Sequence, residues 1–254
     1  MTFAADHRLV REEICDIGRR LVDRGLVVAA DGNISVRLNE AEILCTPTGM
    51  SKGRMTAEDI CTIDLDGKQT GGSRRPSSES LLHLQVYRQR DDVSSIVHAH
   101  PPHVTAFALT RQAIPAGILP EVELFLGEVP MAGYATPGTP ELANSIVPFV
   151  EKSNIVVLAN HGSLAWDSSL ERALWWTEIL ENYCRLLILS RTLGPPAWLT
   201  DEEMREVLAG KEEWGISDAR AGTEFSKSDL RDHPLFQDTW ERTGVQRTAF
   251  DRPK

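Results

Sequence analysis

Long apolar runs, an excess of basic residues and closely spaced cysteines are all absent from this 254-residue chain. No segment approaches the roughly 18 apolar residues that a membrane-spanning helix needs. The first residues, MTFAADHRLVREE, lack the apolar core of a signal peptide. The formal net charge of −10 excludes the basic face that non-specific nucleic-acid binding requires. We therefore expect a cytoplasmic protein that binds neither a membrane nor nucleic acid.

Cysteine is scarce, and its spacing excludes a CxxC motif. The four cysteines are far apart in the sequence and are Cys15, Cys45, Cys61 and Cys184. Such cysteines are expected to be reduced thiols in a cytoplasmic protein. Apolar residues make up 41% of the chain and charged residues 25%, which is typical of a globular protein with a substantial buried core.

Periodicity along the chain predicts helices and strands within one α/β domain. Apolar residues spaced four, three and four apart from Val10 to Leu21 form one face of a helix over residues 8–24, which Gly25 ends. Strands are expected at 26–38 around a turn at 31–33, and at 41–45, 61–71, 94–100 and 154–159. Further helices are expected from residue 77 and at 103–110, 169–193 and 201–210. The domain spans residues 1–216, and we expect the polar tail at 217–254 to pack on it or on a neighbouring subunit.

Three of the seven histidines lie in the decapeptide SSIVHAHPPH, residues 94–103. Residues i and i+2 of a strand share a face, so His98 and His100 present two imidazoles side by side. Pro101 and Pro102 cannot continue a central strand, which places the pair at the strand's end. Two such imidazoles suit a metal ion. Two hydrogen-bonded histidines without a metal would have the same spacing.

Two further residues are candidates for the same site. His161 directly follows the apolar segment IVVLA and precedes a glycine, so it also lies at a strand end. Histidines at the ends of two buried strands of one sheet can converge, and a catalytic site then needs a carboxylate or water as fourth ligand. Glu79, in PSSE, lies at the start of a helix, where an acidic side chain also simply favours the helix dipole.

Six short motifs occur in an order that is specific as a set. They are DGNIS, TPTGMSKG, PSSE, HAHP, GYATPGT and ANHGSLAW, the last followed by LERALWWTEILE. Over residues 8–216 the chain resembles the class II aldolase and adducin family, and within it the fuculose-phosphate aldolase branch. The resemblance implies an α/β fold with three α-β-α layers around a central, mainly antiparallel sheet. It also implies a homotetramer with its sites at subunit interfaces.

The resemblance assigns roles to individual residues of this chain. It implies a zinc ion held by Glu79, His98, His100 and His161, although another divalent metal fits the same ligands. Glu79 then also acts as the base. The implied phosphate pocket consists of Gly32, Asn33, Thr48, Gly49, Ser77 and Ser78. Small hydroxyls, an amide and glycine backbone N–H groups can form an anion nest, and a helix that starts near Ser78 adds its positive end.

The implied activity is that of a lyase of carbohydrate metabolism. A zinc-dependent aldolase of this kind cleaves or forms a small ketose phosphate through a metal-bound enediolate of dihydroxyacetone phosphate. Zinc polarises the carbonyl as a Lewis acid, and Glu79 moves the proton at C3 as a general base. The same machinery serves decarboxylases and dehydratases within the superfamily, which stay as alternatives for a phosphorylated sugar acid or ketose.

The chain departs from the family pattern at two positions on the aldehyde side of the site. Leu119 lies near the place of one family tyrosine, and Trp214 stands where a second is expected. The same segment, LPEVE, offers Glu121 as an acid or base, or equally as an outward residue of a solvated strand, and Glu123 is expected to alternate outward along that strand. The lost tyrosines add weight to decarboxylation or dehydration.

A non-catalytic, adducin-like scaffold is the alternative from another class. A scaffold has no reason to keep four convergent ligands, because unpaired buried histidines cost stability without a metal. Other polar residues nearby have simpler interpretations. We expect His83 to be packed or exposed, His103 to begin the next helix, Tyr134 to pack at a tight turn, and the Arg74–Arg75 pair to be solvated.

Overall fold

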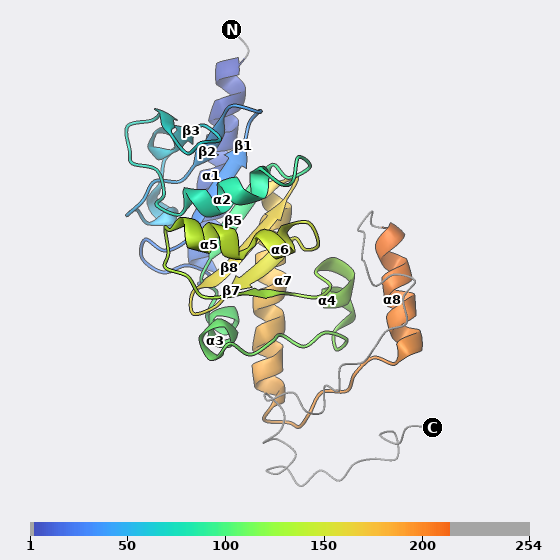
Figure 1. Cartoon of the computed structure of the whole chain (residues 1–254). Helices are drawn as coiled ribbons and strands as arrows, with labels where there is room; N and C mark the ends of the chain where they lie inside the picture. The colour runs from blue at the N-terminus through green and yellow to red at the C-terminus, as the bar shows by residue number, and fades with distance from the viewer. Residues whose placement is uncertain (1–2, 214–254) are drawn as a thin grey trace.

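A computed structural model describes residues 3–213 of the chain. An eight-stranded sheet runs through it in the order β4-β3-β2-β1-β5-β8-β7-β6. Neighbouring strands are antiparallel except for the parallel pair β6 and β7. The expected α/β fold with a central, mainly antiparallel sheet is therefore confirmed (Figure 1).

The strands are short, and the two longest helices have 21 residues each. The strands are β1 (Asn33–Arg37), β2 (Ile43–Cys45), β3 (Cys61–Ile63), β4 (Gln69–Gly71), β5 (Ser95–Ala99), β6 (Met131–Ala132), β7 (Ile155–Leu158) and β8 (Gly162–Asp167). The helices are α1 (Phe3–Asp23), α2 (Ser80–Tyr87), α3 (Pro102–Thr110), α4 (Pro120–Phe125), α5 (Pro140–Ser145), α6 (Val147–Val150), α7 (Leu170–Ser190) and α8 (Asp201–Glu213). Two 3-10 turns are η1 (Lys52–Arg54) and η2 (Ala57–Asp59).

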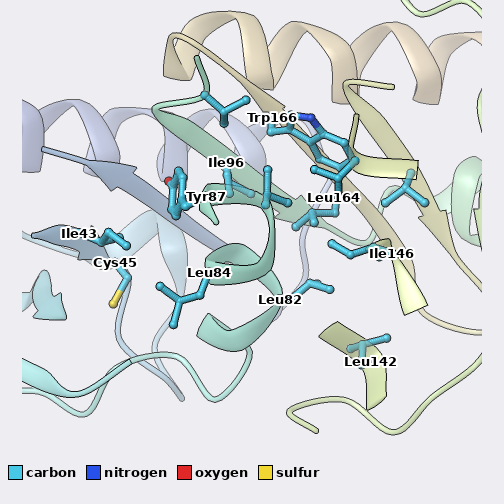
Figure 2. Packing of buried hydrophobic residues seen from close by; sticks show 14 of the residues in the cluster. Ile43, Cys45, Leu82, Leu84, Tyr87, Ile96, Leu142, Ile146, Leu164 and Trp166 are labelled. Carbon is cyan, nitrogen blue, oxygen red and sulfur yellow. The ribbon is translucent and has the colours of Figure 1, made fainter. Parts of the chain in front are cut away.

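Helices α2, α5 and α6 cover one face of the sheet. Leu82 of α2 and Leu142 of α5 belong to the same buried cluster as Ile96 of β5 and Trp166 of β8 (Figure 2). Trp166 has no exposed surface and is among the largest fully buried side chains. Burial of a large aromatic ring stabilises the fold by about 2–3 kcal/mol. This packing holds α2, and the residue that precedes it, close to β5.

Helices α1, α3, α4 and α7 cover the opposite face. Val97 and Ala99 of β5 pack in a buried cluster with residues of α1 and α7. Successive side chains of a strand alternate between its faces. His98, between Val97 and Ala99, therefore points to the α2 face of the sheet, the face on which Ile96 also lies.

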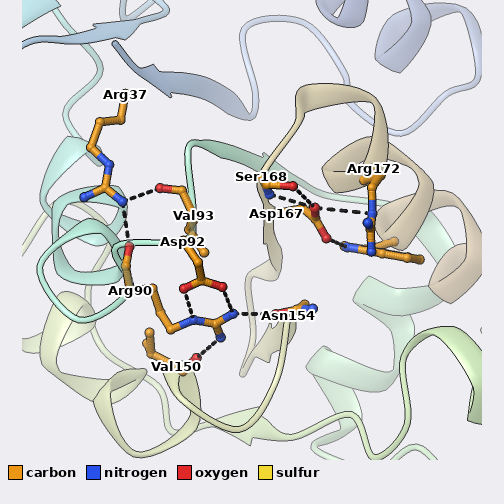
Figure 3. A network of polar contacts seen from close by, with 10 residues as sticks. Arg37, Arg90, Asp92, Val93, Val150, Asn154, Asp167, Ser168 and Arg172 are labelled. Atoms are coloured by element: carbon orange, nitrogen blue, oxygen red, sulfur yellow. Dashed lines mark hydrogen bonds and ion pairs between the residues drawn. The ribbon is translucent and has the colours of Figure 1, made fainter. Parts of the chain in front are cut away.

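A polar network fixes one end of the β5–β8 pair (Figure 3). Arg37 of β1 donates to the carbonyl oxygens of Tyr87, Arg90 and Val93, in the connection between α2 and β5. Asp167, at the end of β8, accepts a 2.9 Å hydrogen bond from the indole N–H of Trp176 in α7. This anchored end lies where β5 begins and β8 ends, so the opposite end is the one that carries the histidines.

Two strand predictions need correction. Residues 162–167, GSLAWD, form strand β8, which was not expected. Residues 26–30 form turns rather than a strand, and only Asn33–Arg37 is extended. Leu26 and Val27 are buried, but Ala29 has a positive φ of 53°, which breaks an extended backbone.

The segment LPEVELF is a short helix, so the solvated strand expected for Glu121 and Glu123 is wrong. Pro120 occupies the first turn of α4, where proline is well tolerated. Glu121 is exposed as expected, but Glu123 is completely buried. The Glu123 carboxylate accepts a 2.5 Å hydrogen bond from the N–H of Gly117 and so closes the preceding loop.

The start of α2 also differs from the expectation. The helix begins at Ser80, Glu79 is its N-cap, and neither Ser77 nor Ser78 caps it through a side chain. The Ser77 hydroxyl instead accepts a 3.3 Å hydrogen bond from the N–H of Glu79. The two serines therefore lie in the loop before α2, and Glu79 is the residue that directly precedes the helix.

All four cysteines are buried free thiols, as expected from their spacing. None of the helices in the described residues is long and apolar enough to span a membrane. Trp214 and the tail at 217–254 lie outside the described residues.

Candidate active site

Three imidazole rings converge at the end of the β5–β8 pair. His98 is on β5, His100 follows that strand directly, and His161 lies in the turn between β7 and β8. The register pairs Ala99 with Ser163, which brings the β7–β8 turn beside the end of β5. The ring centroids are 4.8–4.9 Å apart in all three pairs. The convergence that the strand-end positions indicated is present in the structure.

Glu79 completes the cluster from the entrance of α2. Its carboxylate oxygens lie 3.3 Å from Nε2 of His161 and 3.4 Å from Nε2 of His98. Nε2 of His100 lies 3.1 Å from Nε2 of His98. The Nε2 atoms of all three rings and the Glu79 carboxylate therefore face one common point.

The opposite nitrogens of two rings have partners outside the cluster. Nδ1 of His98 lies 2.9 Å from the Ser163 carbonyl oxygen, so it carries the proton and leaves Nε2 as an electron-pair donor. Nδ1 of His100 lies 3.4 Å from the Asp31 carboxylate. Partners of this kind fix the orientation of metal-binding histidines. Asp31 was not predicted, because the Asp-Gly pair in DGNIS is equally typical of a simple turn.

Asn33 connects the cluster to β1. It is the first residue of that strand, and the register places it directly opposite His98. Its side-chain N–H donates a 2.9 Å hydrogen bond to Oε2 of Glu79. Asn33 is almost completely buried, so it holds the carboxylate in a fixed orientation toward the histidines.

Burial sets the protonation of the cluster. It lowers the pKa of His98 well below the usual histidine value, and the neighbouring His100 and His161 lower it further. Burial also lowers the pKa of His100, and that of His161 to about 4. The pKa of Glu79 is raised by burial, against the hydrogen bond from Asn33. The three imidazoles are therefore neutral at pH 7, as a metal ion requires of its ligands.

The donor set fits a divalent metal ion. Among residues 3–213, His98, His100 and His161 form a group whose nitrogen atoms have metal-ligand spacing. Oε1 of Glu79 is buried and has no hydrogen-bond partner within the described part of the chain, and a buried carboxylate oxygen in that state costs stability. Three neutral imidazole nitrogens and one carboxylate are typical ligands of zinc and of other divalent transition metals. A metal ion would satisfy these atoms together.

Two glycine-containing loops lie beside the cluster. Gly32 has a φ of +70°, and a Cβ atom there would lie 2.7 Å from the His98 carbonyl oxygen, so only glycine fits. Gly49 has a φ of +69° in the loop after Thr48. The N–H of Thr48 donates to the Arg75 carbonyl, so the Thr48–Gly49 loop lies against the segment that leads to Ser77.

The serine segment has a further neighbour in GYATPGT. A Cβ atom on Gly138 would lie 3.3 Å from the Ser78 carbonyl oxygen, so the two loops are in contact. Tyr134, in the same motif, is 56% exposed within the chain, so the expected packing is not found there. The Gly32 loop and the serine segment are thus linked to Glu79 through Asn33 and Ser77, and the Thr48–Gly49 loop contacts the serine segment, whereas Tyr134 is exposed.

Other candidate residues are not brought to the cluster. Glu121 and Leu119 belong to α4 and its N-cap, and α4 packs on α7 and α8. His83 is buried on α2, with Nδ1 2.6 Å from the Ser35 hydroxyl. His103 lies in the first turn of α3, which begins one residue earlier than expected, and its Nδ1 lies 2.6 Å from Glu181 of α7.

Comparisons with known proteins find relatives that are similar in sequence and in fold. Residues 12–188 match the model of the class II aldolase and adducin N-terminal domain. The 5-deoxy-D-ribulose 1-phosphate aldolase of Bacillus thuringiensis serovar kurstaki is 31% identical over 207 residues, which are 81% of this chain and 96% of the relative. The 3-oxo-tetronate 4-phosphate decarboxylase of Haemophilus influenzae is also 31% identical, over 78% of this chain and 95% of the relative. A solved L-fuculose 1-phosphate aldolase is 34% identical, with a TM-score of 0.74 over 82% of this chain and 96% of that one.

Proposed function

Since the chain belongs to the class II aldolase and adducin family and is a lyase, we propose that it is a metal-dependent aldolase for a small ketose phosphate. In this role it releases or uses dihydroxyacetone phosphate. The observation that carries the proposal is the convergence of three neutral imidazoles and Glu79 beside two glycine loops. The two aldolase relatives support a phosphorylated sugar as substrate.

The proposed metal ligands are His98, His100, His161 and Glu79. Zinc is our choice of ion, because imidazole nitrogen and carboxylate oxygen are typical ligands of catalytic zinc, and Glu79 would leave the ion when substrate binds and so open a position for it. When bound, such an ion acts as a Lewis acid that stabilises negative charge developing on the substrate's oxygen atoms. Asp31 and the Ser163 carbonyl orient two of the imidazoles for this role.

Glu79 is the proposed proton carrier at the reacting carbon. In cleavage, the C4 hydroxyl gives its proton to a base on the aldehyde side, for which Glu121 of a neighbouring subunit is the candidate. The C3–C4 bond then breaks, and the electron pair of that bond passes to the C2 carbonyl to form an enediolate. Protonation at C3 then gives dihydroxyacetone phosphate, and C4 leaves as the aldehyde. Glu79 can act in this exchange after it has left the metal, because burial raises the pKa of its carboxyl group in the metal-free chain and a carboxylate that binds a proton more tightly is a better base.

The proposed phosphate pocket consists of the two glycine loops and the serine segment. Its residues are Gly32, Asn33, Thr48, Gly49, Ser77 and Ser78. Some groups of this set already have hydrogen-bond partners within the chain, and the others are available to the phosphate. Asn33 already donates to Glu79, and the Thr48 N–H and the Ser77 hydroxyl have partners within the chain. The Thr48 and Ser78 hydroxyls and the glycine backbone are then the groups that contact the phosphate.

The proposal includes a cytoplasmic location, which the free thiols support. It also includes a homotetramer with sites at subunit interfaces. Large apolar side chains are exposed on the described surface, with Tyr134 at 56% and Trp175 at 47%. Exposed aromatic residues are typical of interfaces. In such an assembly the exposed Glu121 of one subunit serves the site of a neighbour, and in that role we keep it as the aldehyde-side acid or base.

Decarboxylation of a phosphorylated sugar acid, or dehydration of a ketose phosphate, is the second candidate function. The Haemophilus relative, a decarboxylase, is as similar to this chain as the Bacillus aldolase. Leu119 cannot move a proton, so the aldehyde-side chemistry has no matching side chain at that position. A decarboxylase uses the same stabilisation of an enediolate but loses carbon dioxide instead of an aldehyde.

A paired assay tests the two functions. Zinc-loaded protein is incubated with a panel of ketose 1-phosphates and, separately, with phosphorylated 3-keto acids. Dihydroxyacetone phosphate is followed by coupled reduction, and carbon dioxide by a coupled carboxylase. Release of dihydroxyacetone phosphate from a ketose 1-phosphate that is lost with a chelator and restored with zinc supports the aldolase. Carbon dioxide release from a keto acid, with no cleavage of any ketose phosphate, would replace it with the decarboxylase, and neither reaction would contradict both the aldolase and the decarboxylase.

A further inference from the structure

Lys52 is a buried cation beside the proposed phosphate pocket. It begins the short turn η1, and only 1% of its surface is exposed. The backbone around it is fixed by α1, because a Cβ on Gly18 would lie 2.6 Å from the Lys52 carbonyl oxygen. The Lys52 side chain thus extends from a fixed backbone into the interior, where lysine is rare unless its charge is paired.

The ammonium group of Lys52 joins the two glycine loops. Its Nζ donates a 2.9 Å hydrogen bond to the Ala30 carbonyl and a 2.8 Å hydrogen bond to the Met50 carbonyl. Ala30 lies two residues before Gly32, and Met50 directly follows Gly49. Each glycine has a φ near +70°, so each loop turns sharply at the residue proposed to face the phosphate. The Lys52 side chain therefore sets the distance between the 30–33 and 48–50 loops.

The charge of Lys52 is not neutralised by a neighbour. No carboxylate among residues 7–213 forms an ion pair with Nζ, whose hydrogen bonds go to the two carbonyls. Burial lowers the pKa of Lys52 to about 8, and the more distant carboxylates of Asp31 and Glu79 oppose that shift. An ammonium group taken out of water with only carbonyl partners costs stability, which an anion bound nearby recovers.

The two arginines of this region, unlike Lys52, are exposed. Arg74 pairs with Asp59 at 3.0 Å and hydrogen-bonds to it, away from the glycine loops. Arg75 is exposed, and its carbonyl, not its guanidinium, bonds to the Thr48 loop. Lys52 is consequently the buried cation of these loops within the described chain.

We propose that Lys52 is a positioning residue for the substrate's phosphate group. Its ammonium holds the 30–33 and 48–50 loops together and supplies the positive charge that favours a dianionic ester over an uncharged sugar. The inference rests on the proposed function in that it takes the pocket between these loops to be the phosphate site. It adds a cation to a pocket that otherwise consists of hydroxyl, amide and glycine backbone groups.

Two substitutions separate charge from loop spacing. Lys52→Met removes both the charge and the hydrogen bonds at similar volume. Lys52→Gln removes the charge but keeps a donor for one carbonyl, so it covers the case in which the methionine variant does not fold. Lys68→Met is the matched control, because Lys68 is exposed on the β3–β4 turn. Zinc content and thermal unfolding are measured for each variant to establish that the site is intact.

The direct readout is binding of inorganic phosphate to zinc-loaded protein, measured by titration calorimetry at pH 7. Both Lys52 variants should bind phosphate at least about tenfold more weakly, a loss typical of one charged hydrogen-bonding group. Their zinc affinity should stay within about twofold of the unsubstituted protein, and Lys68→Met should match it in both respects. Unchanged phosphate binding by a folded Lys52 variant, or no binding by the unsubstituted protein, overturns the proposal.

Turnover provides a second readout that a merely structural lysine would not produce. With an accepted ketose phosphate, Lys52→Gln should raise KM about tenfold and leave kcat within about threefold, because the reacting carbons are held by other residues. A fall in kcat with an unchanged KM contradicts the role. If no sugar phosphate is cleaved but phosphate binding still depends on Lys52, the proposed reaction fails and the phosphate site stands.

Discussion

Gly162→Ala is the substitution that tests the packing of the histidine cluster most sharply. Gly162 begins β8 directly after His161 and lies against the end of β5. A Cβ atom at this position would lie 2.4 Å from the Ala99 carbonyl oxygen and 2.6 Å from Cδ2 of His100. Ordinary contact begins near 3.4 Å, so the new methyl group must displace the backbone or the His100 ring by close to 1 Å.

The size of the effect follows from the narrow tolerance of a metal site. Ligand distances vary by only about 0.2 Å between functional sites of one kind, which is far less than the displacement required here. Loss of a single orienting partner already lowers metal affinity about 10- to 100-fold. We expect zinc affinity to fall by at least that factor. Overpacking should also lower the free energy of unfolding by about 1–3 kcal/mol.

The assay is competition for zinc against a chelating dye, with thermal unfolding of the metal-free protein as the measure of folding. Gly133→Ala is the matched control, because a Cβ there meets no atom within 4 Å. It should bind zinc as the unsubstituted protein does. A folded Gly162→Ala protein with unchanged zinc affinity would refute the close contact of His100 with the β7–β8 turn.

Three further predictions concern the site and the helix behind it. His161→Ala should lose zinc affinity about 100-fold or more together with turnover, and full zinc content by metal analysis would remove it from the ligand set. Glu79→Gln keeps the shape of the side chain, so kcat should fall about 10²- to 10⁴-fold with little change in melting temperature; an unchanged kcat would exclude it as the proton carrier. Burial lowers the pKa of His83 to about 3, so the metal-free fold loses stability as pH falls from the unfolded value near 6.5 toward 3. Urea unfolding at pH 7.5 and 5 should show about 2 kcal/mol more loss for the unsubstituted protein than for His83→Gln, and equal losses would contradict the buried, neutral state.

The sequence predicted the elements whose patterns are local. The four-three-four spacing of apolar residues in α1 and the strand that carries His98 follow directly from periodicity. Strand β8 was missed because GSLAWD is buried along its whole length and begins with two small residues, so it shows no alternation. The spacing of Glu121 and Glu123 is typical of a strand. Pro120 and the hydrogen bond that the Gly117 N–H donates to Glu123 instead favour a helix.

The site shows the same division between local and long-range information. Strand-end histidines are visible in the sequence, but their convergence depends on the order β1-β5-β8, which residue spacing does not encode. Glu79 could be selected only because the ordered motifs resemble a family. Asp31 and Lys52 were missed because an Asp-Gly pair is typical of any turn, and because a lysine among Gly and Ser is normally exposed. Only the folded chain shows that this lysine is buried.

The proposed reaction requires a metal ion at the histidine cluster. The decisive measurement is a titration of metal-free protein with Zn²⁺ during which cleavage of an accepted ketose phosphate is followed. Activity should be absent at the start, rise in proportion to the zinc added and reach its maximum at about one ion per chain. Full activity in the metal-free protein, or a maximum that His161→Ala reaches at the same stoichiometry, would contradict the account.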